Sequence, residues 1–228
     1  MGSRWIRKCC GTCAFGVSAR STSYLLTAGW LQRLSKGAYL LRGDKLTREG
    51  ILAFIARKIP GLHVGGRSTL IWHTSATLPS TERLVLWGPR PYKFPPWVAE
   101  HPEFSYQTTD LFDGNLPYGT GLSVTESDPC IPVSVPERAL LELVSDAGKI
   151  LATEELVRCV PMAHELRETV LDEFLSHCSR VKVIRLVRDL AQFAGRAWAG
   201  TAQYHVDRLG ADKRWSYLSR NGERLTLK

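Results

Sequence analysis

The sequence feature that most constrains the fold is a segment that predicts a helix followed by a two-stranded hairpin: residues 16–43, GVSARSTSYLLTAGWLQRLSKGAYLLRG. Ser18 is a suitable N-cap, because its hydroxyl can accept a hydrogen bond from an amide of the first turn. Gly29 is a suitable residue to end the helix, because glycine readily adopts the left-handed conformation that often follows one. We therefore predict a helix over residues 19–28.

One face of this predicted helix is polar and the opposite face is apolar. At about 100° per residue, four residues share the polar face: Arg20, Ser23, Tyr24 and Thr27. Leu25 and Leu26 lie on the other side and are expected to anchor the helix to its domain. Guanidinium and hydroxyl groups can reach the edges of DNA bases in the major groove. The division of the helix therefore favours a DNA-reading role for the polar face.

The residues after Gly29 predict the hairpin. Residues 30–34 and 38–41 are rich in large apolar side chains, and the turn between them contains Lys36 and Gly37. Gly37 can supply the positive φ of a tight turn, so we expect Lys36 at the tip. A helix followed by such a hairpin resembles a winged helix-turn-helix, in which the second helix enters the major groove and the wing contacts the DNA backbone. The alternative is an ordinary amphipathic helix and hairpin in a basic domain.

Positive charge is concentrated in the N-terminal part of the chain. Residues 1–43 contain no Asp or Glu, and through residue 67 twelve Lys or Arg residues accompany only Asp44 and Glu49. The formal net charge of all 228 residues is +8. Such a charge distribution suits a polyanionic partner. We expect contacts to DNA phosphate from three of these cations: Arg33, Lys36 and Arg42.

The chain beyond the hairpin predicts a mixed α/β domain. Thr47 is expected to cap a helix that ends at Pro60 and Gly61. We place a domain boundary there, between an N-terminal domain of residues 1–61 and a C-terminal domain of residues 62–228. Short apolar runs broken by Pro and Gly predict strands and loops over residues 63–135.

Residues from Pro136 onward predict helices, including two longer ones over residues 163–177 and 180–197. The second of these carries Lys182, Arg185 and Arg196 on one face. This basic stripe is a second contact for nucleic acid, a contact for an acidic partner protein, or an ordinary solvated face, and the solvated face is the preferred interpretation. The end of the chain predicts a hairpin around Asn221 and Gly222.

The sequence lacks the motifs of common catalytic sites. Gly65, Gly66 and Arg67 resemble part of a phosphate-binding loop, but neither GxxxxGK[ST] nor GxGxxG is present, and a turn with Arg67 near phosphate is the preferred interpretation. The carboxylates are not clustered as a metal-dependent nuclease requires, and no serine lies in GxSxG. We therefore expect no catalytic residues and no cofactor, and predict that the protein is not an enzyme.

Cysteine usage and hydropathy predict no metal site and no membrane segment. Cys9, Cys10 and Cys13 form a close cluster, but a zinc site needs a fourth ligand and usually a second close pair. No run approaches the roughly 20 apolar residues of a membrane span, and the N-terminus is a poor signal peptide. The expected location is the cytoplasm.

Five segments carry a resemblance to a known family: SYLLTAGWLQRLSKGAYLLRGD, LTREGILAFIARKIPGLHVGGRSTLIWH, VPERALLELV, RVKVIRLVRDLAQFAGRAWA and LGADKRWSYLSRNGERLTL. Their order resembles the AbiEi-like antitoxins and transcriptional regulators of type IV toxin–antitoxin systems, over residues 16–228. The resemblance implies an N-terminal winged helix-turn-helix that binds inverted repeats in its own promoter. It also implies a C-terminal domain that opposes a toxin with nucleotidyltransferase chemistry, generally without a stable complex. The family has a regular helix before the reading helix, which residues 1–15 do not predict.

These observations lead to one main hypothesis and two alternatives. The main hypothesis is an α+β antitoxin and DNA-binding autorepressor whose partners are double-stranded operator DNA with inverted repeats and a cognate nucleotidyltransferase toxin. The first alternative is a protein-interaction module that binds the toxin directly, without operator binding. The second is an unrecognised nucleic-acid enzyme, which metal-dependent turnover of RNA or DNA would reveal.

Overall fold

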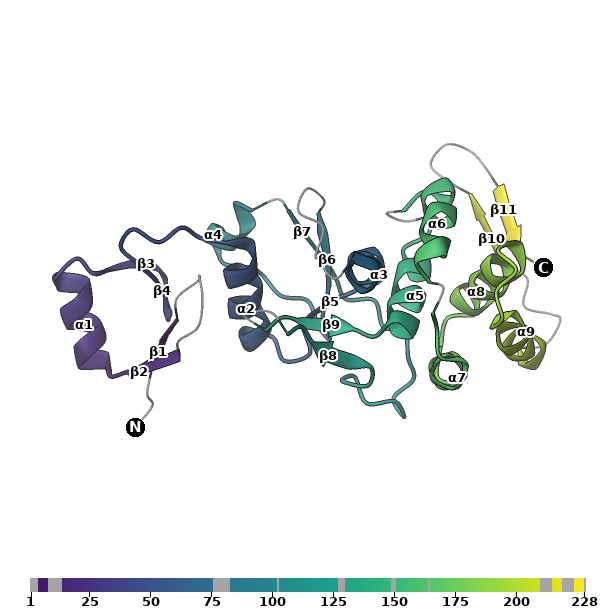
Figure 1. Ribbon diagram of the computed structural model, residues 1–228, viewed down its shortest axis with the longest axis horizontal. Helices are drawn as coiled ribbons and strands as arrows, with labels where there is room; N and C mark the ends of the chain where they lie inside the picture. Colours follow the sequence, from purple (N-terminus) through teal and green to yellow (C-terminus); the bar gives the residue numbers. More distant parts are fainter. Residues whose placement is uncertain are drawn as a thin grey trace.

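The computed structural model describes residues 4–7, 14–75, 83–101, 103–126, 130–148, 151–163, 165–209, 215–218 and 224–227. Within these residues the chain forms an elongated molecule of helices and strands (Figure 1). One helix and two hairpins lie at the N-terminal end, a mixed sheet lies in the middle, and a group of helices lies at the C-terminal end. The α+β class that the sequence predicts is therefore confirmed.

The N-terminal part consists of helix α1 and two antiparallel hairpins. Its elements are β1 (Arg4–Arg7), β2 (Ala14–Val17), α1 (Ala19–Thr27), β3 (Leu31–Ser35) and β4 (Ala38–Leu41). β1 pairs with β2, β3 pairs with β4, and β1 lies beside β4. The Ser21 amide donates to the Ser18 hydroxyl at 3.1 Å, and φ is 73° at Gly29 and 80° at Gly37. The cap, the helix end and the hairpin turn thus form as the sequence predicts.

The middle of the molecule is a mixed sheet of five strands within the described ranges, in the order β7-β6-β5-β9-β8. The strands are β5 (His63–Val64), β6 (Leu84–Trp87), β7 (Phe104–Gln107), β8 (Leu122–Val124) and β9 (Pro132–Ser134). β5 is antiparallel to β6 and parallel to β9, β6 is parallel to β7, and β8 is antiparallel to β9. Along β6, Leu84 and Leu86 join one apolar cluster and Trp87 joins another, as alternating strand residues do.

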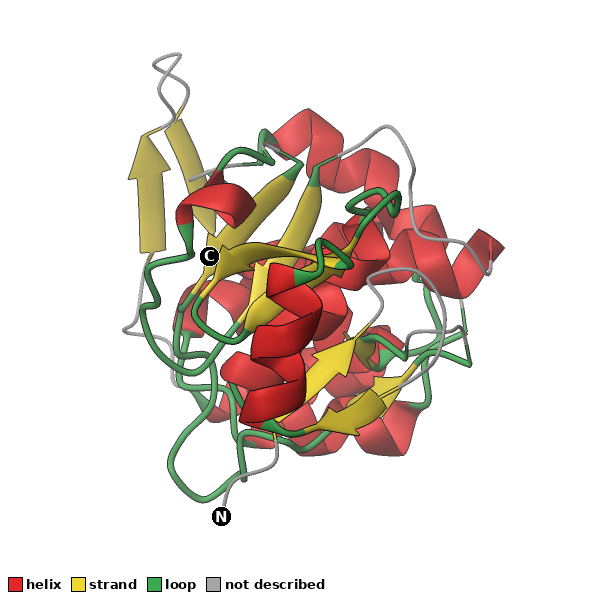
Figure 2. Ribbon diagram, turned by 90° about the vertical axis from the view of Figure 1, so that its left-hand side faces the viewer, coloured by secondary structure: helices red, strands yellow, loops and turns green. Residues whose placement is uncertain are grey.

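Helices cover both faces of this sheet (Figures 1 and 2). The helices that follow α1, in the middle and at the C-terminal end, are α2 (Arg48–Lys58), α3 (Gly66–Ser75), α4 (Pro96–Ala99), α5 (Pro136–Ser145), α6 (Thr153–Cys159), α7 (Glu168–Ser176), α8 (Val181–Phe193) and α9 (Ala199–Arg208), with a 3-10 turn at Val160–Met162. One apolar cluster joins α2 and α4 to the sheet, and a larger cluster joins α3 and α5 to α7, α8 and α9. Strands β10 (Trp215–Leu218) and β11 (Arg224–Leu227) form the predicted C-terminal hairpin.

Helix α2 forms as predicted, but it packs on the sheet. The Thr47 hydroxyl accepts a hydrogen bond from the Gly50 amide at 3.1 Å and so caps the helix. Ile51 and Ile55 are fully buried in the cluster that contains Val64 of β5 and Leu84 of β6. Helix α2 therefore packs on residues that lie beyond the domain boundary predicted at residue 61. The boundary itself stays a prediction.

Three predicted segments differ from the structure. The strands and loops expected throughout residues 63–135 are wrong for α3, which packs on α5 with Leu70 fully buried. The helix expected over residues 163–177 begins only at Glu168. The helix expected over residues 180–197 ends at Phe193, because Gly195 adopts a φ of 59° and lets the chain turn into α9. None of the helices in the described ranges is long and apolar enough to cross a membrane.

Candidate nucleic-acid interface

The polar side of α1 is exposed, and its apolar side packs on the hairpin. Four exposed side chains form what we call the α1 face: Arg20, Ser23, Tyr24 and Thr27. Tyr24 is 70% exposed. Leu25 and Leu26 are partly buried against Leu31 and Tyr39 of the β3–β4 hairpin. The two sides of the helix therefore lie as the sequence predicts.

Two hydroxyl groups of the α1 face, those of Ser23 and Thr27, donate hydrogen bonds within the helix itself. The Ser23 hydroxyl donates to the Ala19 carbonyl and the Thr27 hydroxyl donates to the Ser23 carbonyl, both at 3.0 Å. A hydroxyl oxygen also has lone pairs that can accept hydrogen bonds. Because the donors are used within the helix, the lone pairs of Ser23 and Thr27 remain for donors from outside, such as the amino groups of adenine and cytosine.

The hairpin adds three exposed cations to the N-terminal part. Arg33 lies on β3, Lys36 lies in the turn and Arg42 follows β4. The Arg42 guanidinium lies over Gly29 at the end of α1, since a Cβ placed on Gly29 would be 3.4 Å from its Nη1. Neither Arg20 nor any of these three cations forms an ion pair with a carboxylate of the described residues. Their charges therefore remain available to a polyanion.

Two further exposed residues at this end of the molecule are missed by the sequence analysis. A Cβ placed on Gly37 would be 3.9 Å from Nζ of Lys58, so this lysine of α2 adds a cation near the hairpin turn. Trp30, between α1 and β3, is 64% exposed. The helical period of residues 47–59 gives no signal for Lys58, because its position depends on how α2 packs against the hairpin.

Helix α1 is preceded by strands, whereas the resemblance implies a second helix before the reading helix. The described residues before α1 form strands β1 and β2. The sequence predicts no helix in residues 1–15, and the described part of that segment, residues 4–7 and 14–15, forms strands. Strands therefore precede α1 where the resemblance implies a helix.

The second basic stripe predicted on residues 180–197 is not an open face. Arg185 is only 3% exposed, and Lys182 donates from Nζ to the Ala147 carbonyl. Arg196 is partly buried. Because α8 packs on α5, Arg185 is buried and Lys182 reaches a carbonyl just after the end of α5. Lys182, Arg185 and Arg196 therefore do not form the exposed surface that the sequence predicts.

A buried carboxylate explains the glycine pair that resembles a phosphate loop. A Cβ on Gly65 would overlap the carboxylate of Glu142, and the Gly66 amide donates to Glu142 Oε2 at 3.0 Å. Arg67 pairs with Glu155, so the expected phosphate contact is replaced by an ion pair within the protein. The two glycines thus admit Glu142 to the space beside β5.

Glu142 is 1% exposed and receives four hydrogen bonds. The donors are His63 Nε2 at 2.8 Å, Arg138 Nε at 2.8 Å, the Gly66 amide at 3.0 Å and the Ser134 hydroxyl at 3.0 Å. Burial opposes the ionised form, but the charges and hydrogen bonds of His63 and Arg138 outweigh it and lower the pKa of Glu142 to about 2. From the sequence, residues 136–145 are predicted only as part of the helical region that begins at Pro136. Arg138 and Glu142 are spaced four residues apart within this segment. That spacing is the signal that could have revealed the ion pair around Glu142.

The sequence contains one close cysteine cluster, and no metal site is predicted there. Cys9, Cys10 and Cys13 lie outside the described residues. In the described ranges, no three His, Cys, Asp or Glu side chains are grouped as ligands of a metal ion would be.

The chain matches two family models and is similar to a solved structure. Residues 13–77 match the model described as transcriptional regulator, AbiEi antitoxin N-terminal domain, and residues 81–227 match the model described as transcriptional regulator, AbiEi antitoxin, type IV TA system. The crystal structure of the RV2827C protein from Mycobacterium tuberculosis has a TM-score of 0.52 and 16% sequence identity, and the match covers 85% of this chain and 70% of that one. This likeness concerns the fold alone. No curated protein sequence gives a significant match.

Proposed function

This chain belongs to the AbiEi family of antitoxins and transcriptional regulators of type IV toxin–antitoxin systems, and we propose that it regulates transcription by placing its α1 face in the major groove of operator DNA. The observation that carries the proposal is the α1 face itself, which is exposed and belongs to the same N-terminal part as the three exposed cations of the hairpin. Direct reading of DNA needs this combination of base-contacting and phosphate-contacting groups.

The contacts divide by chemistry. Arg20 suits a guanine edge, because a guanidinium can donate to O6 and N7 together. Ser23, Tyr24 and Thr27 supply hydroxyl groups to neighbouring bases or phosphates. Three cations neutralise phosphates on either side of the groove: Arg33, Lys36 and Arg42. In this proposal α1 is the reading helix of a winged helix-turn-helix, and the β3–β4 hairpin is its wing.

The operator and the toxin complete the proposal. The DNA is the promoter of the protein's own gene with inverted repeats, so binding represses its own synthesis. The opposed toxin is a nucleotidyltransferase, and the protein acts in the cytoplasm. Residues 1–61 form the DNA-binding domain and residues 62–228 the antitoxin domain. Support comes from the family to which the chain belongs and from the positive charge of residues 1–43.

Lys36 and Arg20 provide the test, because the proposal gives them different roles. Lys36→Ala should weaken binding to every DNA sequence alike and reduce the slope of log affinity against log salt by about 0.9, the value for one phosphate contact. Arg20→Ala should change the preference among operator variants by about 1–3 kcal/mol at one position. The measurement is fluorescence anisotropy of the full-length protein on promoter and scrambled duplexes, at several salt concentrations.

Lys93→Ala is the matched control, because Lys93 is an exposed lysine in the loop before α4. It should leave both affinity and salt slope unchanged. If Lys36→Ala also leaves them unchanged, the hairpin is not a DNA-contacting wing. If the wild-type protein binds promoter and scrambled duplexes equally, the operator proposal is overturned.

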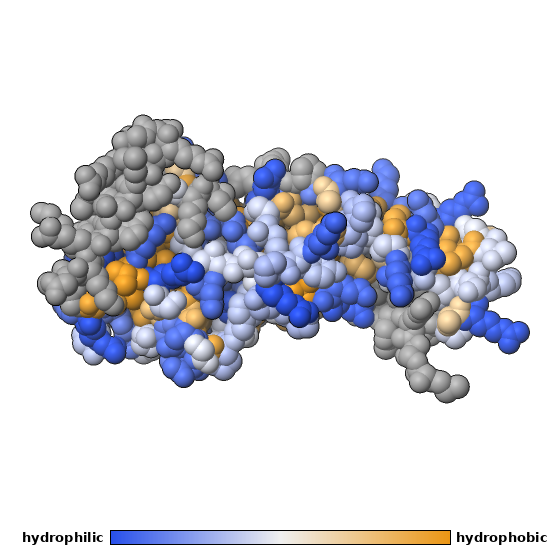
Figure 3. Space-filling view, turned by 180° about the vertical axis from the view of Figure 1, so that it is seen from behind, coloured by the Kyte–Doolittle hydropathy of each residue, from blue (hydrophilic) through white to orange (hydrophobic). Residues whose placement is uncertain are grey.

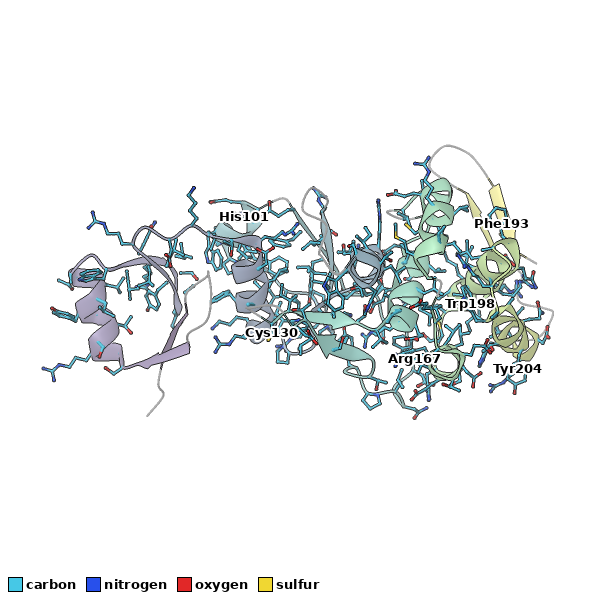
Figure 4. All side chains as sticks on the ribbon, viewed as in Figure 1. His101, Cys130, Arg167, Phe193, Trp198 and Tyr204 are labelled. Atoms are coloured by element: carbon cyan, nitrogen blue, oxygen red, sulfur yellow. The ribbon has the colours of Figure 1, made fainter. Side chains whose placement is uncertain are left out.

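A second candidate function is direct toxin binding without operator binding. The observation that favours it lies at the other end of the molecule, where Phe193 of α8 is 75% exposed and Tyr204 of α9 is 58% exposed. Figure 4 shows both at the C-terminal end, and Figure 3 shows hydrophobic surface at the same end, on the left of that view. Co-purification with the neighbouring toxin at moderate salt, abolished by Phe193→Ala, would support this candidate. Failure of the toxin to co-purify would oppose it.

A further inference from the structure

The turn of the β3–β4 hairpin lies against helix α2. A Cβ placed on Gly37 would be 3.9 Å from Nζ of Lys58, an exposed residue in the last turn of α2. Lys36, which precedes Gly37 in the turn, is also exposed. Figure 1 shows the hairpin between α1 and α2 along the molecule. Two exposed lysines from separate elements therefore lie at the junction of the hairpin and α2.

Aromatic packing holds Lys58 in this position. Its Nζ lies 5.5 Å from the centroid of the Phe54 ring, one helical turn earlier in α2, and a cation is attracted to the face of an aromatic ring. The Phe54 ring meets the buried ring of Trp97 with centroids 5.1 Å apart. Trp97 Nε1 in turn donates to the Ser35 hydroxyl at 3.1 Å. The same pair of rings thus positions the side chain of Lys58 and the start of the hairpin turn.

The charges of Lys36 and Lys58 are not neutralised within the described part of the protein. Neither lysine forms an ion pair with a carboxylate there. A cation in the last turn of a helix is favourable in itself, because it interacts with the helix dipole. That interaction does not explain why Nζ of Lys58 approaches a turn that carries a second lysine. Like charges repel, and an anion from outside the protein that contacts both would offset the repulsion.

Strand β3 (Leu31–Ser35) limits the distance between these lysines and α1. A strand rises at most about 3.4 Å per residue, so residues 31–36 span no more than about 17 Å. Phosphates follow one another about every 3.4 Å along one strand of duplex DNA. The two lysines therefore lie within the length of about five base pairs from the end of α1.

We propose that Lys36 and Lys58 together form a phosphate site, which holds two neighbouring phosphates of duplex DNA, one for each ammonium group. Lysine suits this role, because it binds phosphate as a point charge and a phosphate contact does not read the base sequence. The inference rests on the proposed function and extends it, because it adds α2 to the DNA contacts of α1 and the hairpin. The site increases affinity for duplex DNA of any sequence.

Lys58→Met tests the site, because it removes the ammonium group and keeps an apolar stem beside Phe54. Its urea midpoint should equal that of the wild type. It should weaken binding to promoter and scrambled duplexes alike, by about five- to tenfold at about 0.1 M salt, and reduce the slope of log affinity against log salt by about 0.9. The double variant Lys36→Ala/Lys58→Met should reduce the slope by about 1.8. Fluorescence anisotropy of the full-length protein at several salt concentrations measures both quantities.

Two further variants are controls. Lys58→Arg keeps the positive charge and should keep the slope, since a guanidinium also binds phosphate. Lys93→Met removes an exposed lysine from the loop before α4 and should leave affinity and slope unchanged. Methylphosphonate substitution, which removes the charge of one phosphate at a time, locates the contact. At one position it should weaken binding by the wild type and have no effect on Lys58→Met.

The outcomes separate this inference from the proposed function. An unchanged slope for Lys58→Met, when Lys36→Ala lowers it, would overturn the phosphate site and leave the operator proposal intact. A slope that only Lys58→Met lowers, or that Lys93→Met lowers equally, would also overturn the phosphate site. Equal binding of promoter and scrambled duplexes, with both lysine effects present, would support the site and overturn the operator proposal. Failure of the wild type to bind any duplex would overturn both.

Discussion

Glu142 shows how much a single buried residue determines in this protein. It joins α5, where Arg138 lies, to β5 through His63, to β9 through Ser134 and to the start of α3 through Gly66. A buried charge is tolerated only when it is paired and hydrogen-bonded, and all four of its contacts meet that condition. The removal of its charge would leave the buried Arg138 guanidinium without compensation.

We expect Glu142→Gln to lower the free energy of unfolding by about 3–5 kcal/mol, because the substitution breaks a buried ion pair and leaves Arg138 uncompensated. Urea denaturation at neutral pH measures this change. Glu100→Gln, at an exposed site, should stay within about 0.5 kcal/mol of the wild type. A Glu142→Gln protein as stable as this control would contradict the assigned role.

The same substitution should alter the response to acid. The pKa of Glu142 is lowered from 4.5 to about 2 in the folded protein, so the stabilisation by its charge is complete above about pH 4.5. That stabilisation is lost as the pH falls from about 4.5 to about 2. The difference in unfolding free energy between wild type and Glu142→Gln should therefore shrink over this range. A constant difference would mean that Glu142 is not the group that titrates.

The α1 face and the group of side chains that bind the Glu142 carboxylate differ in how far the sequence predicts them. The helical period of the sequence alone assigns Arg20 and Tyr24 to the exposed side of a helix and Leu25 to the packed side. The partners of Glu142 come from β5, β9 and α3, and no local sequence pattern predicts which strands will pair. Residues 182–196 show the same limit, because the period groups Lys182 and Arg185 on one face but does not say that α5 covers it.

At the scale of elements, local chemistry predicts the N-terminal part well. Ser18 and Thr47 accept amide hydrogen bonds at the starts of α1 and α2, and Gly29 and Gly37 have the positive φ that their positions require. Helix α3 is missed because its first residue is Gly66 and its helical form depends on packing against α5. Tertiary contacts therefore decide what local propensity leaves open.

The cap of α1 gives a prediction at this scale. Ser18→Ala removes the side chain that accepts from the Ser21 amide, and should destabilise the helix by about 1 kcal/mol. Hydrogen exchange of the α1 amides should become about fivefold faster, while the amides of α5 keep their rates.

Ser18→Thr is the matched variant, because a threonine hydroxyl can still accept the bond. It should exchange nearly as the wild type does. Equal protection of α1 in the wild type and Ser18→Ala would show that the cap contributes nothing to the helix.

At the scale of the whole molecule, Trp97 joins the N-terminal end to the sheet. Its Nε1 donates to the Ser35 hydroxyl of β3 at 3.1 Å, and its ring meets Phe54 of α2 with centroids 5.1 Å apart. Ala38 of β4 belongs to the same apolar cluster as Leu84 and Leu86 of β6. The hairpin that carries Lys36 is thus packed on the core of the middle part through α2 and α4.

We expect Trp97→Ala to cost about 3–5 kcal/mol and to loosen the hairpin more than the sheet, because it empties the contact between them. Urea denaturation measures the first effect. Hydrogen exchange resolved by segment measures the second, and should show a larger loss of protection in residues 31–41 than in residues 84–87.

Trp97→Phe keeps most of the apolar contact and removes only the hydrogen bond to Ser35, so it should cost about 1 kcal/mol. If Trp97→Ala lowers protection equally in both segments, the hairpin and the sheet unfold as one unit and Trp97 is not the joint between them. This long-range joint is also what the sequence could not predict, since residues 89–97 resemble an irregular proline-rich loop.

Gly65 restricts which residues can occupy position 142 in homologous proteins. Its hydrogen atom stands where any larger substituent would overlap the Glu142 carboxylate. Homologous proteins that acquired alanine at this position should therefore carry a shorter side chain in place of Glu142, and the two positions should covary through evolution although they lie far apart in the chain.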